Sequence, residues 1–293
     1  MVALATQTDC TASAFVSQLL DVLEQRFGHD LSTRQLARTL AGAGFLACDA
    51  HPERLADYLT LLRTLPLEAP LVQSLVQPAV DNDSYFFRDA PAMTSLREQI
   101  LPSLLEAARA TRVFRVWSAG CSNGEELYTL SILLHELVPN LECWRLELVG
   151  TDIDGRALAQ ARAAQYDERS LRATTPEQRA RYFHYDPDVE RYILQARYRR
   201  GTSFGLFNLV DASAPLPAPG RFDLVLCRNV SIGLTSAARA LLDRKLQSAL
   251  ALHGQWIAGP SDPLPSCGLD VRVLPGMMAF RRAALRAEQA DGV

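Results

Sequence analysis

VFRVWSAGCSNGEE, residues 113–126, is the stretch that decides the fold of this chain. Val113–Trp117 is rich in β-branched and aromatic residues, which favour a strand. Ser118–Gly124 contains two glycines and is typical of a turn, and apolar residues then recur at helical spacing from Glu125 to Leu137. A strand, a glycine turn and a helix in this order predict the beginning of a βαβ unit.

The segments that follow continue the alternation of strands and helices. Leu146–Thr151 predicts a second strand, and Asp154 can cap a helix that runs to about Gln165. Further strands, a helix and a hairpin are predicted at Phe222–Cys227, Ser236–Leu252, Gln255–Ala258, Val271–Leu274 and Met277–Arg281. This alternation predicts an α/β fold with a parallel sheet.

Residues 167–210 interrupt the alternation. Thr175–Tyr182 predicts a short helix, and Arg191–Tyr198 and Ser203–Asn208 are expected to form antiparallel strands. We therefore expect a small antiparallel β insertion over residues 167–210 of the α/β domain.

Residues 13 to about 78 predict a small all-α domain. Apolar residues recur at helical spacing from Phe15 to Leu23, and Gly28 ends that helix. The chain is therefore expected to divide into a helical domain and junction over residues 1–90 and an α/β domain over residues 91–293.

The composition indicates a folded protein and excludes one class of function. The chain has 293 residues, is 48% hydrophobic and carries a net charge of −3, a balance that argues against disorder. A general nucleic-acid binder needs an excess of basic residues, so no nucleic-acid partner is expected. Lys245 is the sole lysine. The preference for arginine fits a GC-rich genome, although arginine is also the better ligand for carboxylates.

The cysteines and the N-terminus predict a cytoplasmic location. The six cysteines form no CxxC pair and have no histidines at metal-binding spacing, so neither a disulfide framework nor a metal site is expected. The first residues lack the basic and apolar regions of a signal peptide. No apolar run approaches the roughly 20 residues that span a bilayer, and no membrane insertion is expected.

The turn at residues 118–124 suits a nucleoside ligand. Gly120 and Gly124 let the backbone approach a ligand closely, and the next helix presents free N–H groups. Asp152 ends the second strand, where its carboxylate can accept hydrogen bonds from both ribose hydroxyls. This arrangement is common to NAD and S-adenosylmethionine and does not separate them.

Glu125 and Glu126, at the start of the helix, favour S-adenosylmethionine. The turn lacks the GxGxxG pattern that binds a pyrophosphate. Two carboxylates repel a phosphate but attract an ammonium group, which S-adenosylmethionine carries at its methionine end. The alternative is that both carboxylates simply complement the helix dipole.

Four strings of the chain carry a resemblance to a known family. They are SYFFRD at 84–89, VWSAGCSNGEE at 116–126, TDID at 151–154 and FDLVLCRNV at 222–230. In order and spacing they resemble the CheR-type chemoreceptor glutamate methyltransferases over about residues 13–282. The resemblance implies a helical N-terminal domain and a Rossmann-like S-adenosylmethionine domain with an inserted β-subdomain. It also implies methyl transfer to glutamate side chains in the cytoplasmic domain of a chemoreceptor.

The resemblance further implies a set of cofactor-binding residues, which are Asn82, Ser84, Arg88, Glu126, Asp152, Asn208, Leu209, Arg228 and Asn229. Asp152 matches the ribose ligand and Glu126 an acidic contact after the glycine turn. Arg88 is also the candidate catalytic residue, because an arginine near the methyl group can hold the substrate carboxylate. Arg228 has a structural alternative as an ion-pair partner, and Phe86 and Phe87 are expected in the core.

The chain departs from the family pattern at several places. Gly233 stands where the family has a tyrosine near the transferable methyl group, which puts catalytic efficiency in doubt, and Asp262 replaces a glutamate. The family's second helix is rich in basic residues, whereas Ser32–Phe45 contains two arginines. In some relatives the inserted β-subdomain docks a receptor peptide. The arginines of the insertion could do the same or form a solvated face, and they are Arg191, Arg197, Arg199 and Arg200.

These observations leave three functions in competition. A protein-glutamate O-methyltransferase that uses S-adenosylmethionine is favoured. Gly233 supports the alternative, a catalytically weakened module that binds S-adenosylmethionine or S-adenosylhomocysteine and regulates a partner protein. A small-molecule methyltransferase is disfavoured by the junction motif and the β insertion.

Overall fold

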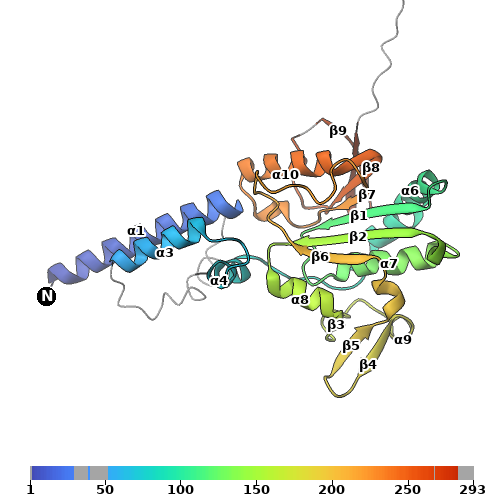
Figure 1. Cartoon of the computed structure of the whole chain (residues 1–293), viewed down its shortest axis with the longest axis horizontal. Coiled ribbons are helices and arrows are strands. Elements are labelled where there is room, and N and C mark those ends of the chain that lie inside the picture. Colours follow the sequence, from blue (N-terminus) through green and yellow to red (C-terminus); the bar gives the residue numbers. More distant parts are fainter. Residues whose placement is uncertain (1, 30–38, 40–51, 267, 283–293) are drawn as a thin grey trace, which may run out of the picture.

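A seven-stranded sheet forms the centre of the molecule (Figure 1). The computed structural model describes residues 2–29, 39, 52–266 and 268–282. The strand order is β6-β2-β1-β7-β8-β10-β9, in which the first five strands pair in parallel and β10 pairs antiparallel with β8 and β9. The strands are β1 (Val113–Ala119), β2 (Arg145–Asp152), β6 (Thr202–Leu206), β7 (Phe222–Leu226), β8 (Leu250–Ala258), β9 (Leu269–Leu274) and β10 (Met277–Arg282). The predicted α/β fold and the C-terminal hairpin are confirmed.

Helices cover both faces of this sheet. In Figure 1, α10 lies on one face and α7 and α8 lie on the other. The helices of the α/β domain are α5 (Ala90–Ser95), α6 (Leu101–Ala108), α7 (Glu125–Leu137), α8 (Gly155–Ala163), α9 (Pro176–Tyr182) and α10 (Ser236–Ala249). A π-helical turn over Leu96–Ile100 joins α5 to α6. Asp154 caps α8 as predicted, because its side chain accepts from the amides of Arg156 and Ala157.

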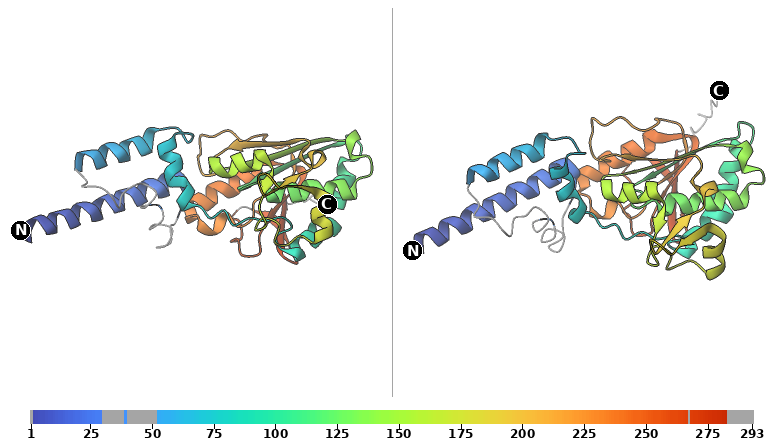
Figure 2. Two further views of the ribbon diagram at one scale, coloured as in Figure 1. Left: turned by 90° about the horizontal axis from the view of Figure 1, so that it is seen from below. Right: turned by 60° about the horizontal axis from the view of Figure 1, so that its bottom comes forward.

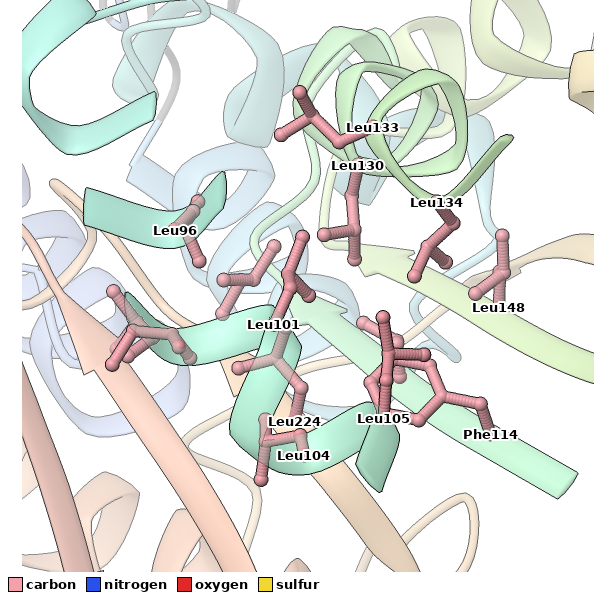
Figure 3. Close-up of a cluster of buried hydrophobic side chains, with 14 of the residues drawn as sticks. Leu96, Leu101, Leu104, Leu105, Phe114, Leu130, Leu133, Leu134, Leu148 and Leu224 are labelled. Atoms are coloured by element: carbon pink, nitrogen blue, oxygen red, sulfur yellow. The ribbon is translucent and has the colours of Figure 1, made fainter. Parts of the chain in front are cut away.

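The alternation of side chains along β1 divides the core into two parts. Phe114 and Val116 point to the face covered by α6 and α7, whereas Trp117 and Ala119 point to the face covered by α10. Figure 3 shows leucines of α6 and α7 facing one another in the cluster that also contains Phe114. β1 is buried on both faces over Val116–Ala119, as the mostly apolar sequence of a central parallel strand favours.

A second, three-stranded sheet lies beside the large one, in the order β3-β5-β4. Its strands are β3 (Gln165–Tyr166), β4 (Phe183–Asp186) and β5 (Arg191–Leu194), and both pairings are antiparallel. The expectation that Ser203–Asn208 is part of the antiparallel insertion was wrong. Thr202–Leu206 is β6 and pairs in parallel with β2 at the edge of the large sheet.

The N-terminal helices lie at one end of the α/β domain, as both views of Figure 2 show. They are α1 (Val2–Phe27), α3 (Pro52–Thr64) and α4 (Pro70–Ala79), and they share a core of their own. Gly28 ends α1 with a left-handed φ of +68°, as predicted. Apart from Thr39, the arginine-poor stretch Ser32–Phe45 lies outside the described residues. No helix within the described ranges is both long and apolar enough to cross a bilayer.

Replacement of Leu130 tests the packing of α7 against the sheet. Leu130 is 1% exposed, and Leu130→Ala is expected to lower the free energy of unfolding by about 2–5 kcal/mol, because it deletes buried methyl groups and leaves a cavity. The control is Leu252→Ala, a residue that is 73% exposed, for which a change within about 0.5 kcal/mol is expected. Urea unfolding measures both variants, and an equal loss of unfolding free energy in the two would contradict this packing.

Candidate active site

A cavity of about 610 Å³ opens where the loops after β1, β2, β6 and β7 meet the junction between the helical and α/β domains. In a parallel sheet, ligands bind outside the carboxyl ends of the strands, where the strand order reverses. All nine residues predicted to bind a cofactor line this cavity, namely Asn82, Ser84, Arg88, Glu126, Asp152, Asn208, Leu209, Arg228 and Asn229. The structure therefore brings the whole predicted set together.

The turn after β1 forms one wall of the cavity. Gly120 adopts a left-handed φ of +81°, and a Cβ there would lie 2.4 Å from the Val230 side chain. A larger residue is excluded for both reasons. The amides of Gly120 and Cys121 donate to the Thr151 carbonyl at 2.8 and 2.9 Å, which ties the turn to the end of β2.

Asp152 lies at the centre of the hydrogen bonds between the turn and β2. Its two oxygens accept one backbone bond each, Oδ2 from the Ser122 amide at 2.7 Å and Oδ1 from the Asp154 amide at 3.0 Å. Burial raises the pKa of the Asp152 carboxyl, and these backbone donors partly oppose the increase. A carboxylate oxygen has two lone-pair sites, so both oxygens can accept a further bond from a ligand.

Asn82 connects the junction to the same loops. Its Nδ2 donates to Asp154 Oδ2 at 2.7 Å, and its Oδ1 accepts from Ser122 Oγ at 3.3 Å. Asn82 therefore fixes the junction over the turn and also lines the cavity.

Arg228 lies between two carboxylates on the opposite wall. Its side chain is 4% exposed, and its NH groups contact Asp89 and Glu126, each at 3.4 Å. Glu126 also accepts from Ser118 Oγ at 3.0 Å. Arg228 thus forms the ion pairs considered from the sequence and also lines the cavity, so its contact with a cofactor stays a prediction. One guanidinium between two carboxylates leaves this end of the cavity with excess negative charge, which suits a bound cation.

Glu125, in contrast, lies outside the cavity. Ser170 Oγ donates to its Oε1 at 3.1 Å, and burial raises the pKa of its carboxyl. Of the two carboxylates that open α7, Glu126 alone faces the cavity. Ser84 lines the cavity from the junction.

Arg88 lies at the rim of the cavity, partly exposed. Its guanidinium donates to the Asp83 carbonyl at 2.5 Å and lies 5.7 Å from the centre of the Tyr85 ring. Phe86 is fully buried, as predicted for a core residue, and Phe87 packs partly buried against two core clusters. Phe86 thus anchors the junction in the core, while the Arg88 side chain remains accessible at the rim of the cavity.

Asn208 and Leu209 follow β6 and approach the end of α1. Asn208 Nδ2 donates to the Arg26 carbonyl at 2.8 Å, and its Oδ1 accepts from the Val210 amide at 3.0 Å. Both Asn208 and Leu209 are buried. The pair therefore joins the helical domain to the rim of the cavity.

Sequence reasoning assigned no role to Asp262 and did not consider His29. Asp262 is buried and accepts from the Asn229 amide at 2.7 Å, Ser231 Oγ at 2.7 Å and the Gly259 amide at 2.8 Å. It thereby shapes the loop after β7. One signal was available for Asp262, because the aspartate keeps the carboxylate of the glutamate that the family has at this position. His29, which lines the cavity from the end of α1, had no signal in its local sequence.

Comparison with known proteins agrees with this geometry. Residues 82–278 match the family model of the CheR methyltransferase, SAM binding domain. The chain belongs to the CheR methyltransferase family. It is 30% identical over 209 residues to a probable chemotaxis protein methyltransferase of Rhizobium etli, covering 70% of this chain and 76% of the relative. It is 32% identical to chemotaxis protein methyltransferase 1 of Pseudomonas aeruginosa, and the match covers 66% of this chain and 70% of the relative. It is 27% identical to the chemotaxis protein methyltransferase of Borreliella burgdorferi, and this match covers 85% of this chain and 88% of the relative.

The cofactor of this CheR methyltransferase is S-adenosylmethionine, and the cavity fits it. A volume of about 610 Å³ lies within the usual range for small-molecule sites. Asp152 offers free lone pairs for hydroxyl groups, and the excess negative charge beside Arg228 suits an ammonium group. The left-handed glycine at position 120 allows close approach of a ligand to the backbone.

Asp262→Ala tests the loop after β7. It leaves the buried Gly259 amide, the buried Ser231 hydroxyl and the partly buried Asn229 amide without their acceptor, so we expect the free energy of unfolding to fall by about 3 kcal/mol. Asp270→Ala is the control, because its ion pair with Arg281 is exposed and a loss below about 1 kcal/mol is expected. Similar unfolding curves for the two variants would show that Asp262 does not organise this loop.

Proposed function

We propose that this chain transfers a methyl group from S-adenosylmethionine to glutamate side chains of a chemoreceptor-type protein and forms methyl esters. The observation that carries the proposal is the cavity itself, in which nucleoside-binding and cation-binding groups lie next to the accessible Arg88. The reaction is assigned to the cytoplasm, where the free thiols of Cys121, Cys143 and Cys227 stay reduced.

On this proposal the cofactor is held along the carboxyl edge of the sheet. Asp152 accepts the ribose hydroxyls, and Glu126 with Arg228 receives the charged methionine end. Asn208 and Leu209 border the adenine side. When bound, S-adenosylmethionine supplies an electrophilic methyl group on its sulfonium sulfur.

The chain's own residues have little chemistry to perform on the acceptor. A glutamate side chain with an ordinary pKa near 4.3 is already an anionic nucleophile at neutral pH. No general base is needed, and the protein contributes orientation and the exclusion of water. We assign to Arg88 the holding of the acceptor carboxylate, since it is an accessible guanidinium at the rim of the cavity.

The second candidate function is a weakened module that binds the cofactor and regulates a partner. Gly233 favours it, because this residue lines the cavity and has no side chain with which to orient an acceptor. The two functions differ in turnover and share the cofactor site, so a transfer assay separates them.

Asp152→Ala tests the cofactor placement. Loss of two charge-assisted hydrogen bonds is expected to weaken binding of S-adenosylmethionine by about 100-fold or more in calorimetry. In the wild-type protein, affinity should also fall as the pH is lowered through the raised pKa of the Asp152 carboxyl, because protonation removes one acceptor. The exposed Asp188→Asn serves as the control, and thermal unfolding checks that each variant is folded. Unchanged affinity of Asp152→Ala would contradict the placement.

Arg88→Gln tests the acceptor side. With cofactor tritiated in its methyl group and a receptor cytoplasmic domain, the wild-type protein should yield base-labile label that is released as volatile methanol. Arg88→Gln is expected to lower kcat/KM about 100-fold, because the guanidinium–carboxylate bonds are lost. Arg109→Gln, at an exposed position, should leave the rate unchanged. Cofactor binding without any transfer by the wild-type protein would favour the regulatory module.

A further inference from the structure

The end of α1 forms a strap across two of the loops that border the cavity. The Arg26 carbonyl accepts from Asn208, in the loop after β6. The Gly28 carbonyl accepts from the Thr235 amide at 2.9 Å, and His29 forms an isolated antiparallel bridge with Leu234, beyond β7. The backbone of residues 26–29 is therefore fixed at both sides of the cavity.

This strap places the His29 side chain in the cavity against Gly233. The imidazole Nδ1 lies beside the Gly233 backbone. A Cβ at Gly233 would lie 3.9 Å from His29 Nδ1 and would meet no other heavy atom within 4 Å among the described residues beyond its chain neighbours. Thus an aromatic ring from the helical domain borders the space that a side chain at position 233 would enter.

The environment of His29 favours a neutral ring. Burial lowers the pKa of the imidazole, and the neighbouring Gly233 backbone opposes this only in part. In a neutral imidazole one nitrogen carries a proton and the other is an acceptor. Donation to the Gly233 carbonyl would use the single N–H and leave an electron-rich ring, which attracts a cation and does not repel it.

The strand order places His29 on the side of the methyl group. Asp152 ends β2 and Gly233 follows β7, while β1 lies between these two strands. With the ribose at Asp152 and the charged methionine end beside Arg228, the sulfonium lies between these two points and is bordered by the loop after β7. His29 of the strap and Gly233 of that loop both line the cavity, and they face each other there.

We propose that His29 is a specificity-determining residue whose imidazole ring contacts the sulfonium centre and raises affinity for S-adenosylmethionine relative to the uncharged product, S-adenosylhomocysteine. The inference rests on the cofactor placement in the proposed function. It gives the helical domain a direct contact with the reacting part of the cofactor. A ring that favours the cation also helps release of the product, in which the positive charge has disappeared.

Calorimetric titration with each of the two ligands tests this assignment. His29→Ala is expected to weaken binding of S-adenosylmethionine about 3- to 10-fold and to change that of S-adenosylhomocysteine less than about twofold. His29→Phe keeps a ring and should retain most of the preference. His253→Ala is the matched control, because His253 is exposed on β8 and outside the cavity. Equal losses for both ligands, or no loss for either, would overturn the proposal.

A double variant separates the ring contact from a structural role of His29. In His29→Ala/Gly233→Tyr, the new ring enters the vacated space from the opposite loop, and the preference for the charged ligand should return. If it does not return and His29→Phe also lacks it, the ring contact is refuted. Failure of the proposed function gives different results. Either Asp152→Ala binds S-adenosylmethionine as tightly as the wild-type protein does, or the wild-type protein binds the cofactor but transfers no methyl group.

Discussion

The bonds between the turn after β1 and the end of β2 are the constraint on which the site depends. The Thr151 carbonyl holds two amides of the turn, and the Asp152 carboxylate holds the Ser122 amide. These bonds fix the turn at Gly120. This residue has no side chain, and the Val230 side chain packs against it. They also keep a buried carboxylate at the centre of the cavity with capacity for further donors. Asn82 then places the junction over the same point through Asp154 and Ser122.

A second feature of the site is its distribution of charge. Glu126, Arg228 and Asp89 form a partly buried set with one positive and two negative groups. Such a set is costly to bury unless a cation completes it, as the ammonium group of the cofactor would on the proposed placement. Glu125 next in sequence contributes nothing to this charge, because it is turned away and bonded to Ser170. The helical domain closes the opposite side with the strap at residues 26–29.

Much of this architecture could be predicted from local sequence. Strand, glycine turn and capped helix are properties of short segments. The nine site residues that the family resemblance implied all line one cavity. The pairing of β6 could not be predicted, because a strand of five residues does not reveal whether its neighbour runs parallel or antiparallel. The orientation of Glu125 and Glu126 likewise depends on which face of α7 meets the junction. Asp262 and His29 contact the loop after β7 across long sequence separations. The family pattern signalled a carboxylate at position 262, but no local pattern indicates which groups either residue contacts.

Hydrogen exchange of the wild-type protein with and without S-adenosylmethionine tests the central claim most directly, namely that this cavity is the cofactor site. The account predicts slower exchange at the turn after β1, at the end of β2 and in the loop after β7, together with the strap at residues 26–29. Exchange in the small sheet, at β4 and β5, should be unchanged, because neither strand lines the cavity. Protection that spares the turn and the end of β2 while appearing elsewhere would contradict the account.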